Sequence, residues 1–266
     1  PPSAAPITSR VRIDASFAKD ENNIQHINFA YGDKTYKTIN ECSEPLKTFS
    51  KDLNSVFVPS KEILTALKTI KYARQKLYLP GFDDTFLDLI KSVEVPKSLK
   101  DESNSLAAMQ RQLDELFESK IHSSGGEEPF ISQKDNKKFS ISLTSDGLKR
   151  VGIISSLLKN NQIRKGTILF IDEPEANLHP RIIRSFIEVI MEFATKDIQV
   201  FLASHNYFVT KQLTIYAKRQ NIPVTCHALS KDDNGKTKID TMDLRNGLPQ
   251  VPIITESEKM FHEIIG

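Results

Sequence analysis

The sequence predicts an α/β protein built mainly on a parallel β-sheet flanked by helices, with an antiparallel β region and a helical insertion. Three observations lead to this fold class. From residue 146 onward, continuous apolar runs alternate with segments of helical periodicity, as in a parallel sheet whose strands are covered on both faces. Before residue 61, β-branched and aromatic residues mix with polar ones, as in antiparallel strands. A charged stretch of helical periodicity lies between these two regions.

The first predicted part is a β-rich region at 1–60. Its opening, PPSAAP, is rich in proline and is expected to be extended or disordered. The stretches RVRIDASF and HINFAYGDKTYKTI predict a short β-meander that turns at Gly32 and Asp33. SVFVPS, at 55–60, predicts a further strand that ends at Pro59.

The second predicted part is helical and covers 61–125. Apolar residues recur at helical spacing over 61–77, 83–93 and 99–120. The charged helix at 99–120 is expected to pack its apolar face on the core as part of a helical subdomain; a short lever arm is the alternative interpretation. SSGGEEP then predicts a loop.

The third predicted part, 126–266, is the α/β core. It begins with a hairpin over 130–143 that turns at Asp135 and Asn136. A second hairpin near the C-terminus turns at Asn234 and Gly235. Between and after these hairpins the sequence predicts helices at 146–161, 180–196, 206–220 and 255–265 and buried strands at 167–173 and 198–205.

Composition limits the classes of function. The 266 residues are 39% hydrophobic and 26% charged, with 36 Lys and Arg against 34 Asp and Glu. The small net charge gives no global electrostatic argument for nucleic acid, although a local basic patch stays possible. No apolar run has the length of a membrane span and no signal peptide is visible, so no membrane partner is expected. Cys42 and Cys226 fit neither a disulfide framework nor a zinc site, which favours a reducing cytoplasm.

Two adjacent carboxylates follow the apolar run ILFI: Asp172 and Glu173. The carboxyl ends of parallel strands line the crevice where such sheets bind ligands. Phosphoryl transfer to water needs one carboxylate to hold Mg²⁺ through its water shell and a base to position the attacking water. Asp172 suits the first role and Glu173 the second. A strand that simply runs into a solvated turn is the alternative.

Two further stretches bear on the same chemistry. The next predicted strand ends in Ser204 and His205, and a histidine there can bond a terminal phosphate and the attacking water; a purely structural histidine is the alternative. The turn before the helix at 146–161 contains Ser145 and Gly147. Free amides at a helix N-terminus bind anions, and glycine permits close approach; an ordinary N-cap is the alternative.

Taken together and in this order, these motifs resemble the second half of an ABC-type ATPase head. TSDGLKR resembles the signature motif, ILFIDEPE the Walker B strand with its catalytic glutamate, EANLHP the D-loop and ASHN the H-loop. The resemblance is strong over residues 140–210. DEPEANLHP is unlike transporter ATPases and resembles the OLD-like and SMC-like AAA ATPases.

The resemblance implies an ABC-type fold that binds ATP and Mg²⁺ between two heads of a homodimer. Glu173 and His205 would be catalytic, and Asp172 would hold Mg²⁺ through water. Ser145 and Gly147 would contact the γ-phosphate across the dimer, and Asn177 to His179 would line the interface. A separate effector or nuclease chain, DNA or RNA, and a role in bacterial defence follow from the family alone.

The sequence contains no phosphate-binding loop of the form GxxxxGK[ST]. Its one Gly-Lys-Thr, Gly235 to Thr237, has Ser230 at the position of the first glycine and falls in a predicted hairpin. The loop is therefore expected upstream of Pro1, or the chain is a degenerate partner subunit. This chain alone is expected to hydrolyse ATP poorly. A non-catalytic scaffold and an SMC-like DNA-repair head are the rival functions.

Overall fold

The computed structural model describes residues 11–18, 24–31, 41–42, 54–77, 82, 84–94, 104–122, 130–133, 137–232 and 234–265. The chain divides into two compact units, Pro1–Leu53 and Asn54–Gly266. The first unit holds three antiparallel strands in the order β1 (Val11–Ala18), β2 (Ile24–Tyr31) and β3 (Glu41–Cys42). This arrangement confirms antiparallel strands in the first two predicted stretches, whereas the part of the predicted meander at 34–39 lies outside the described residues and β3 follows it. The PPSAAP opening and the turn at Gly32 and Asp33 lie outside the described residues.

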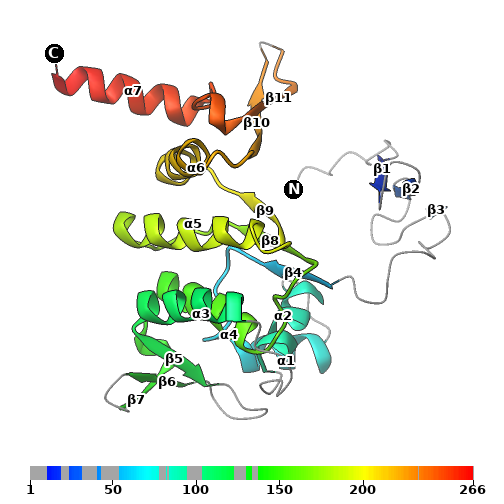
Figure 1. The fold of residues 1–266 in the computed structure, drawn as a ribbon. Helices are drawn as coiled ribbons and strands as arrows, with labels where there is room; N and C mark the ends of the chain where they lie inside the picture. Colours follow the sequence, from blue (N-terminus) through cyan, green and yellow to red (C-terminus); the bar gives the residue numbers. More distant parts are fainter. Residues whose placement is uncertain are drawn as a thin grey trace, which may run out of the picture. The chain divides into compact units, whose positions relative to one another are not determined.

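The second unit contains the α/β core (Figure 1). Its strands are β4 (Asn54–Val58), β5 (Ser119–His122), β6 (Phe130–Gln133), β7 (Lys138–Ser140), β8 (Thr167–Asp172), β9 (Gln199–Ala203), β10 (Thr225–Lys231) and β11 (Thr237–Asp243). Its α-helices are α1 (Leu67–Gln75), α2 (Asp84–Glu94), α3 (Asn104–Phe117), α4 (Asp146–Lys159), α5 (Pro180–Ala194), α6 (Tyr207–Gln220) and α7 (Pro252–Ile265). Two short 3₁₀ helices are η1 (Ile141–Leu143) and η2 (Leu244–Asn246). The predicted fold class, a mainly parallel α/β core with antiparallel β regions, is confirmed.

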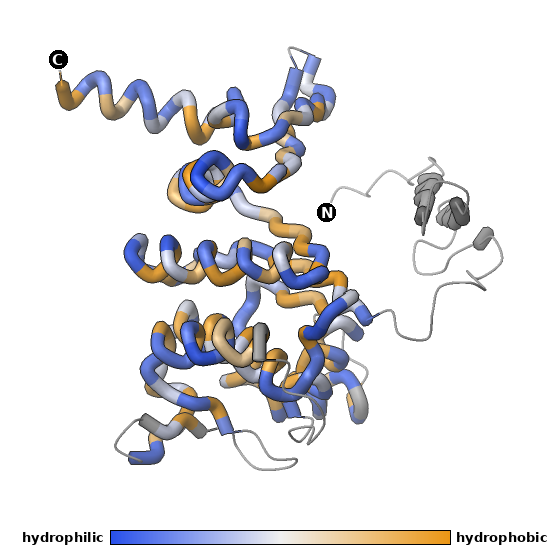
Figure 2. The backbone as a smooth tube through the Cα atoms, in the orientation of Figure 1, coloured by the Kyte–Doolittle hydropathy of each residue, from blue (hydrophilic) through white to orange (hydrophobic). Residues whose placement is uncertain are grey.

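The central sheet is parallel, in the order β4-β8-β9. Val58 pairs with Ile171 and Ile171 with Leu202, so all three strands end at the same edge. Hydrophobic residues are concentrated along these strands (Figure 2). This shared edge places the residues that follow β8 and β9 next to each other.

One face of this sheet belongs to the hydrophobic core, and the other is open. Leu169 and Ile171 are fully buried. The alternate residues form a row in register across the opposite face: Phe57, Phe170 and Phe201 are 38%, 39% and 47% exposed. The rings of Phe170 and Phe201 stack with centroids 5.0 Å apart. The expectation that both faces of these strands are covered is therefore wrong for the described residues: apolar runs predict two covered faces, but one of them is exposed here.

Helix α4 is the most buried helix of the core. Every residue from Val151 to Leu158 is buried. Helix α3 packs its own apolar face, including Met109 and Leu113, into the same core. The predicted packing of this helix on the core is confirmed, and the lever-arm interpretation is wrong for α3.

Two predicted helices have different bounds in the structure. The helix expected from residue 61 begins only at Leu67. The carboxylate of Glu62 instead accepts hydrogen bonds from the amides of Leu64 and Thr65, which holds residues 62–65 in a turn. The helix expected over 99–120 ends at Phe117, because Glu118 takes a positive φ and the chain enters β5. Strand β5 was missed by the sequence analysis, and it completes the sheet β5-β6-β7.

The remaining predicted elements agree with the structure apart from their ends. The hairpin of β6 and β7 is confirmed, and its turn at Asp135 and Asn136 lies outside the described residues. The hairpin of β10 and β11 is confirmed, with Gly235 in a positive-φ turn. Helix α7 begins at Pro252 rather than at residue 255. Among the described residues, no helix is long and apolar enough to cross a membrane.

Candidate functional site

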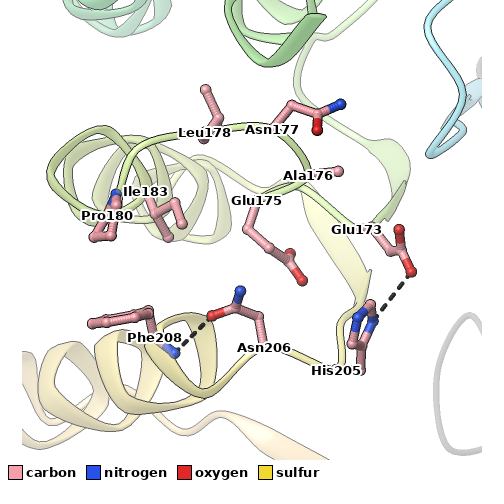
Figure 3. Close-up of a pocket in the computed structure, with 10 residues that line it drawn as sticks. All are labelled: Glu173, Glu175, Ala176, Asn177, Leu178, Pro180, Ile183, His205, Asn206 and Phe208. Carbon is pink, nitrogen blue, oxygen red and sulfur yellow. Dashed lines mark hydrogen bonds and ion pairs between the residues drawn. The ribbon is translucent and has the colours of Figure 1, made fainter.

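The site lies at the edge where β8 and β9 end. Asp172 is the last residue of β8, and Glu173 follows it. His205 lies two residues beyond Ala203, which ends β9 and pairs with Asp172. Nδ1 of His205 lies 3.1 Å from Oε1 of Glu173, as the dashed line in Figure 3 shows. The sequence placed these residues at adjacent strand ends, and the structure brings the carboxylate and the imidazole into direct contact.

The backbone holds Glu173 in an unusual conformation. Its φ is 46°, in the left-handed region that costs a non-glycine residue about 1 kcal/mol or more. The amide of Glu173 donates to the carbonyl of Ala203 at 2.9 Å, and its carbonyl accepts from the amide of Ala176 at 3.1 Å. These bonds hold the peptide groups on both sides of the residue. The direction of the Glu173 side chain is therefore set by β9 and by the turn that follows β8.

Arg150 of α4 also binds the backbone of Glu173. Its side chain is only 4% exposed. Its two terminal nitrogens donate to the carbonyl oxygens of Glu173 and Ser60, so one guanidinium joins α4 to the ends of β8 and β4. Burial lowers the pKa of Arg150, and the nearby carboxylates, led by Glu175 and Glu173, act in the opposite direction. Because an arginine pKa lies far above neutrality, the group stays charged.

The turn before α4 leaves the start of that helix open. Ser145 is the N-cap residue, it is exposed, and its side chain makes no capping hydrogen bond. Asp146 instead accepts from Nζ of the buried Lys149 at 3.0 Å. Ser145 thus holds the N-cap position, but its hydroxyl does not cap the helix as the ordinary N-cap interpretation requires. Uncapped amides at a helix N-terminus are suited to bind an anion.

Gly147 lies directly against the turn after β8. A Cβ atom at Gly147 would stand 2.4 Å from the carbonyl oxygen of Asn177 and 2.8 Å from a methyl carbon of Leu178. Only a glycine permits this approach of α4 to the predicted D-loop. Within one chain, the predicted signature turn therefore packs directly against the backbone of the predicted D-loop.

The other two predicted D-loop residues have distinct positions. Asn177 is exposed with a φ of 60°, a conformation that asparagine tolerates better than most residues. His179 is the N-cap of α5, and its Nδ1 accepts from the amide of Arg181 at 3.2 Å. Asn177 therefore lines the site edge, whereas one ring nitrogen of His179 is used in capping a helix.

A pocket of about 370 Å³ opens beside the Glu173–His205 contact. It lies between the turn after β8, the first turn of α5 and the start of α6 (Figure 3). Its lining residues are Glu173, Glu175, Ala176, Asn177, Leu178, Pro180, Ile183, His205, Asn206 and Phe208. The pocket combines carboxylates at one end with apolar side chains at the other.

Asp172 can serve as one ligand of a magnesium site, but the described residues around it do not form a complete one. Among the described residues, no group of three or more His, Cys, Asp or Glu side chains could hold a metal ion. Mg²⁺ in phosphoryl-transfer sites is typically bound by one or two carboxylates, with waters and substrate phosphates as the other ligands. Asp172 fits that role. The phosphate cradle is not found in the 266 residues.

Sequence reasoning missed Arg150, Lys149 and Glu175 as members of the site. All three are buried. The signal for the two cations was the helix around them, which is apolar on nearly all sides and so can only be buried. A charge in a buried helix must be paired, and this rule would have pointed to both residues.

Comparisons with known proteins place the chain in a family. The family described as "AAA domain, putative AbiEii toxin, Type IV TA system" matches residues 5–210. None of the curated proteins matches the chain.

Several solved structures are distantly similar in fold. The SMC head domain from Thermotoga maritima is 14% identical with a TM-score of 0.44, over 87% of this chain and 73% of that one. A structure titled for ATP-driven dimerization of SMC ATPases is 14% identical with a TM-score of 0.38, over 61% and 94%. An Smc head domain with an extended coiled coil from Pyrococcus furiosus is 12% identical with a TM-score of 0.37, over 75% and 48%.

The family match covers most of the chain, including β8, the turn after it and His205. It confirms the AAA ATPase head that the motifs predict. The chain belongs to this family of AAA domains.

Proposed function

We propose that the chain is the hydrolysing part of an ABC-type, OLD-like ATPase, which works as a dimer of heads and couples ATP to an effector or a nucleic acid. The observation that carries the proposal is the 3.1 Å contact between Glu173 and His205 beside Asp172. A strand that merely ran into a turn would not need a carboxylate held against an imidazole from the neighbouring strand end.

In the proposed reaction, Glu173 is the general base. With a proton on Nδ1, His205 donates to Oε1 of Glu173, which leaves Oε2 to accept the proton of the attacking water. In the imidazolium form, in which both ring nitrogens carry a proton, Nε2 of the exposed His205 can also donate to a terminal phosphate. Asp172 would hold Mg²⁺ through its water shell. When bound, Mg²⁺ and ATP supply the electrophilic phosphoryl group and the neutralisation of its charge.

The phosphate-binding loop has to come from outside these 266 residues, either from another segment of the same protein or from a partner subunit. The open sheet face supports this proposal. Asp172 lies on the same face of the sheet as Phe170 and Phe201, because it pairs with Ala203 two residues beyond the Phe170–Phe201 pair. A loop-bearing segment that packed on this row would bury apolar surface and reach Asp172.

Turnover of ATP by the protein together with its phosphate loop tests the proposal. Glu173→Gln should lower kcat about a hundredfold or more while ATP binding is retained, because only the proton acceptor is lost. Asp197→Asn is a matched control, since Asp197 is an exposed carboxylate at positive φ that pairs with Lys165 away from the site. Equal and negligible rates in the wild type and Glu173→Gln would instead favour a non-catalytic scaffold.

The wider role is proposed from the family. Its printed description names a putative toxin of a type IV toxin–antitoxin system. We extend this to an effector-coupled role in bacterial defence, in the cytoplasm, with a separate effector or nuclease chain. Helix α3 packs into the core and gives no evidence of a long coiled-coil arm, so the DNA-repair head is the weaker alternative. Salt-dependent DNA binding by the protein would revive it.

A further inference from the structure

Glu175 is a buried carboxylate with one oxygen left unsatisfied. The residue is 6% exposed. Its Oε1 accepts a hydrogen bond from Oγ of Ser204 at 2.8 Å. Its Oε2 is buried and has no hydrogen-bond partner among the described residues. An unpaired buried charge is costly, so such an atom calls for a donor beyond those that the described residues supply.

The surroundings of Glu175 exclude most donors from within the chain. Arg150 is close enough for the carboxylate to affect its pKa, but its terminal nitrogens donate to the carbonyls of Glu173 and Ser60. Asn206 uses its side-chain oxygen to cap α6, where it accepts from the amide of Phe208 at 2.8 Å, and its Nδ2 makes no hydrogen bond to Oε2 of Glu175. In Figure 3 the Glu175 carboxylate points into the pocket between Asn206 and His205.

The pocket itself defines the chemistry of a suitable ligand. At the Glu175 end it needs a hydrogen-bond donor, and the described residues contain no cluster of metal-binding side chains. Away from Glu175 the wall is apolar and includes Ile183 and the half-exposed ring of Phe208. A guanidinium on a methylene stem fits both ends: the head pairs with the carboxylate, and the stem covers the apolar wall.

We propose that this pocket receives an arginine side chain from a second copy of the chain, and that Arg181 provides it. Arg181 is exposed and follows Pro180, which lines the pocket. Among the described residues no ion pair of Arg181 is found, whereas Arg184 lies 3.9 Å from Glu188 of its own helix. The Arg181–Glu175 pairing depends on the proposed function in one respect, namely that the chain forms a dimer.

Symmetry favours this occupant. In a two-fold interface the same surface patch is present on both copies, so when the axis passes beside the pocket a residue next to the pocket on one copy faces the pocket of the other. Arg181 meets this condition by its place next to Pro180, which lines the pocket together with Glu175. A dimer centred on it would form two identical Arg181–Glu175 pairs, each desolvated and complementary in charge.

The dimerisation constant, measured by sedimentation with and without Mg-ATP, tests the pocket. Glu175→Gln keeps the shape and the bond to Ser204 but presents a donor where an acceptor is needed. Glu175→Gln and Arg181→Gln should each weaken the dimer about tenfold or more, the usual effect of losing charge-assisted hydrogen bonds. Arg184→Gln, one turn along the same helix, is the matched control and should leave the constant nearly unchanged.

Mixing the two variants adds a readout that a folding defect cannot produce. A heterodimer of Glu175→Gln with Arg181→Gln keeps one intact pair, so the mixture should associate more strongly than either variant alone. A dimer of unchanged strength in Glu175→Gln would contradict the binding of Arg181 in the pocket but would leave the ATPase proposal standing. A wild-type protein that stays monomeric in every condition overturns both the pocket and the dimer, and the turnover measurement still decides hydrolysis separately.

Discussion

Glu173 and His205 are in contact at 3.1 Å although the whole of α5 lies between them in the sequence. The contact follows from topology. β8 and β9 are parallel neighbours in register, so the residues that follow them stand at one edge. The positive φ of Glu173 and its bonded peptide groups then fix the carboxylate in place. The register of the sheet and the left-handed backbone conformation of Glu173 thus together produce the candidate site.

Arg150 is predicted to be a positioning residue for Glu173. Arg150→Met should lower kcat with little change in KM, because the carbonyl of Glu173 loses a donor and the base is no longer held. The same variant removes two charge-assisted hydrogen bonds, although the carbonyl of Glu173 keeps its bond from the amide of Ala176, and should cost about 2–5 kcal/mol of the free energy of unfolding. Steady-state kinetics and denaturant unfolding measure the two effects.

Arg150→Lys separates position from charge. An ammonium group keeps the positive charge but cannot donate to the carbonyls of Glu173 and Ser60 with a planar fork. We expect partial recovery of stability without recovery of kcat. Full recovery of kcat by lysine would show that only the charge of Arg150 matters.

Gly147→Ala is predicted to separate α4 from the predicted D-loop. Its Cβ would stand 2.4 Å from a backbone oxygen of Asn177, and backbone does not yield easily. The expected loss of stability is about 1–3 kcal/mol, with a larger relative loss of activity. Gly152→Ala is the control on the same helix, because its Cβ would meet the flexible end of Ile121. Equal effects of both substitutions would contradict a special role for the contact with Asn177.

Ser145 is predicted to act on the ligand rather than on the helix. Because its side chain makes no capping bond, Ser145→Ala should change the free energy of unfolding by less than about 0.5 kcal/mol. Asn206→Ala, which removes a real cap, should cost about 1 kcal/mol. ATP-dependent dimerisation should weaken in Ser145→Ala. A loss of stability as large as that of Asn206→Ala would restore the ordinary N-cap interpretation.

His122 is predicted to make the β5-β6-β7 region sensitive to acid. Burial, followed by the charges of Lys159, Lys138 and Lys120, lowers its pKa from the ordinary 6.5. Between the folded and unfolded pKa values the unfolded state binds more protons, so stability falls as the pH drops below about 6.5.

A substitution isolates this contribution. Nε2 of His122 lies 2.8 Å from Oγ of Ser132, and glutamine can keep a bond to that hydroxyl without titrating. Thermal unfolding at a series of pH values between neutrality and pH 5 should show a smaller acid-dependent loss in His122→Gln than in the wild type. Parallel curves would show that His122 does not contribute.

The sequence was sufficient for the elements of the core and for the grouping of Asp172, Glu173 and His205, because buried parallel strands leave strong apolar runs with polar ends. It could not reveal the open face of the sheet, since an apolar run is the same whether one face or two are covered. It also missed β5, which follows a residue at positive φ at the end of a helical pattern. Arg150 and Glu175 were missed because a buried charge differs from an exposed one only through its packing partners.

The most direct test of the account is a double-mutant cycle on kcat for Glu173→Gln and His205→Ala, in the protein together with its phosphate loop. Residues that act as one unit show non-additive losses, so the double variant should be about as slow as Glu173→Gln alone. Losses that simply multiply, or a His205→Ala variant as fast as the wild type, would contradict the claim that the contact between these two residues is the hydrolysis site.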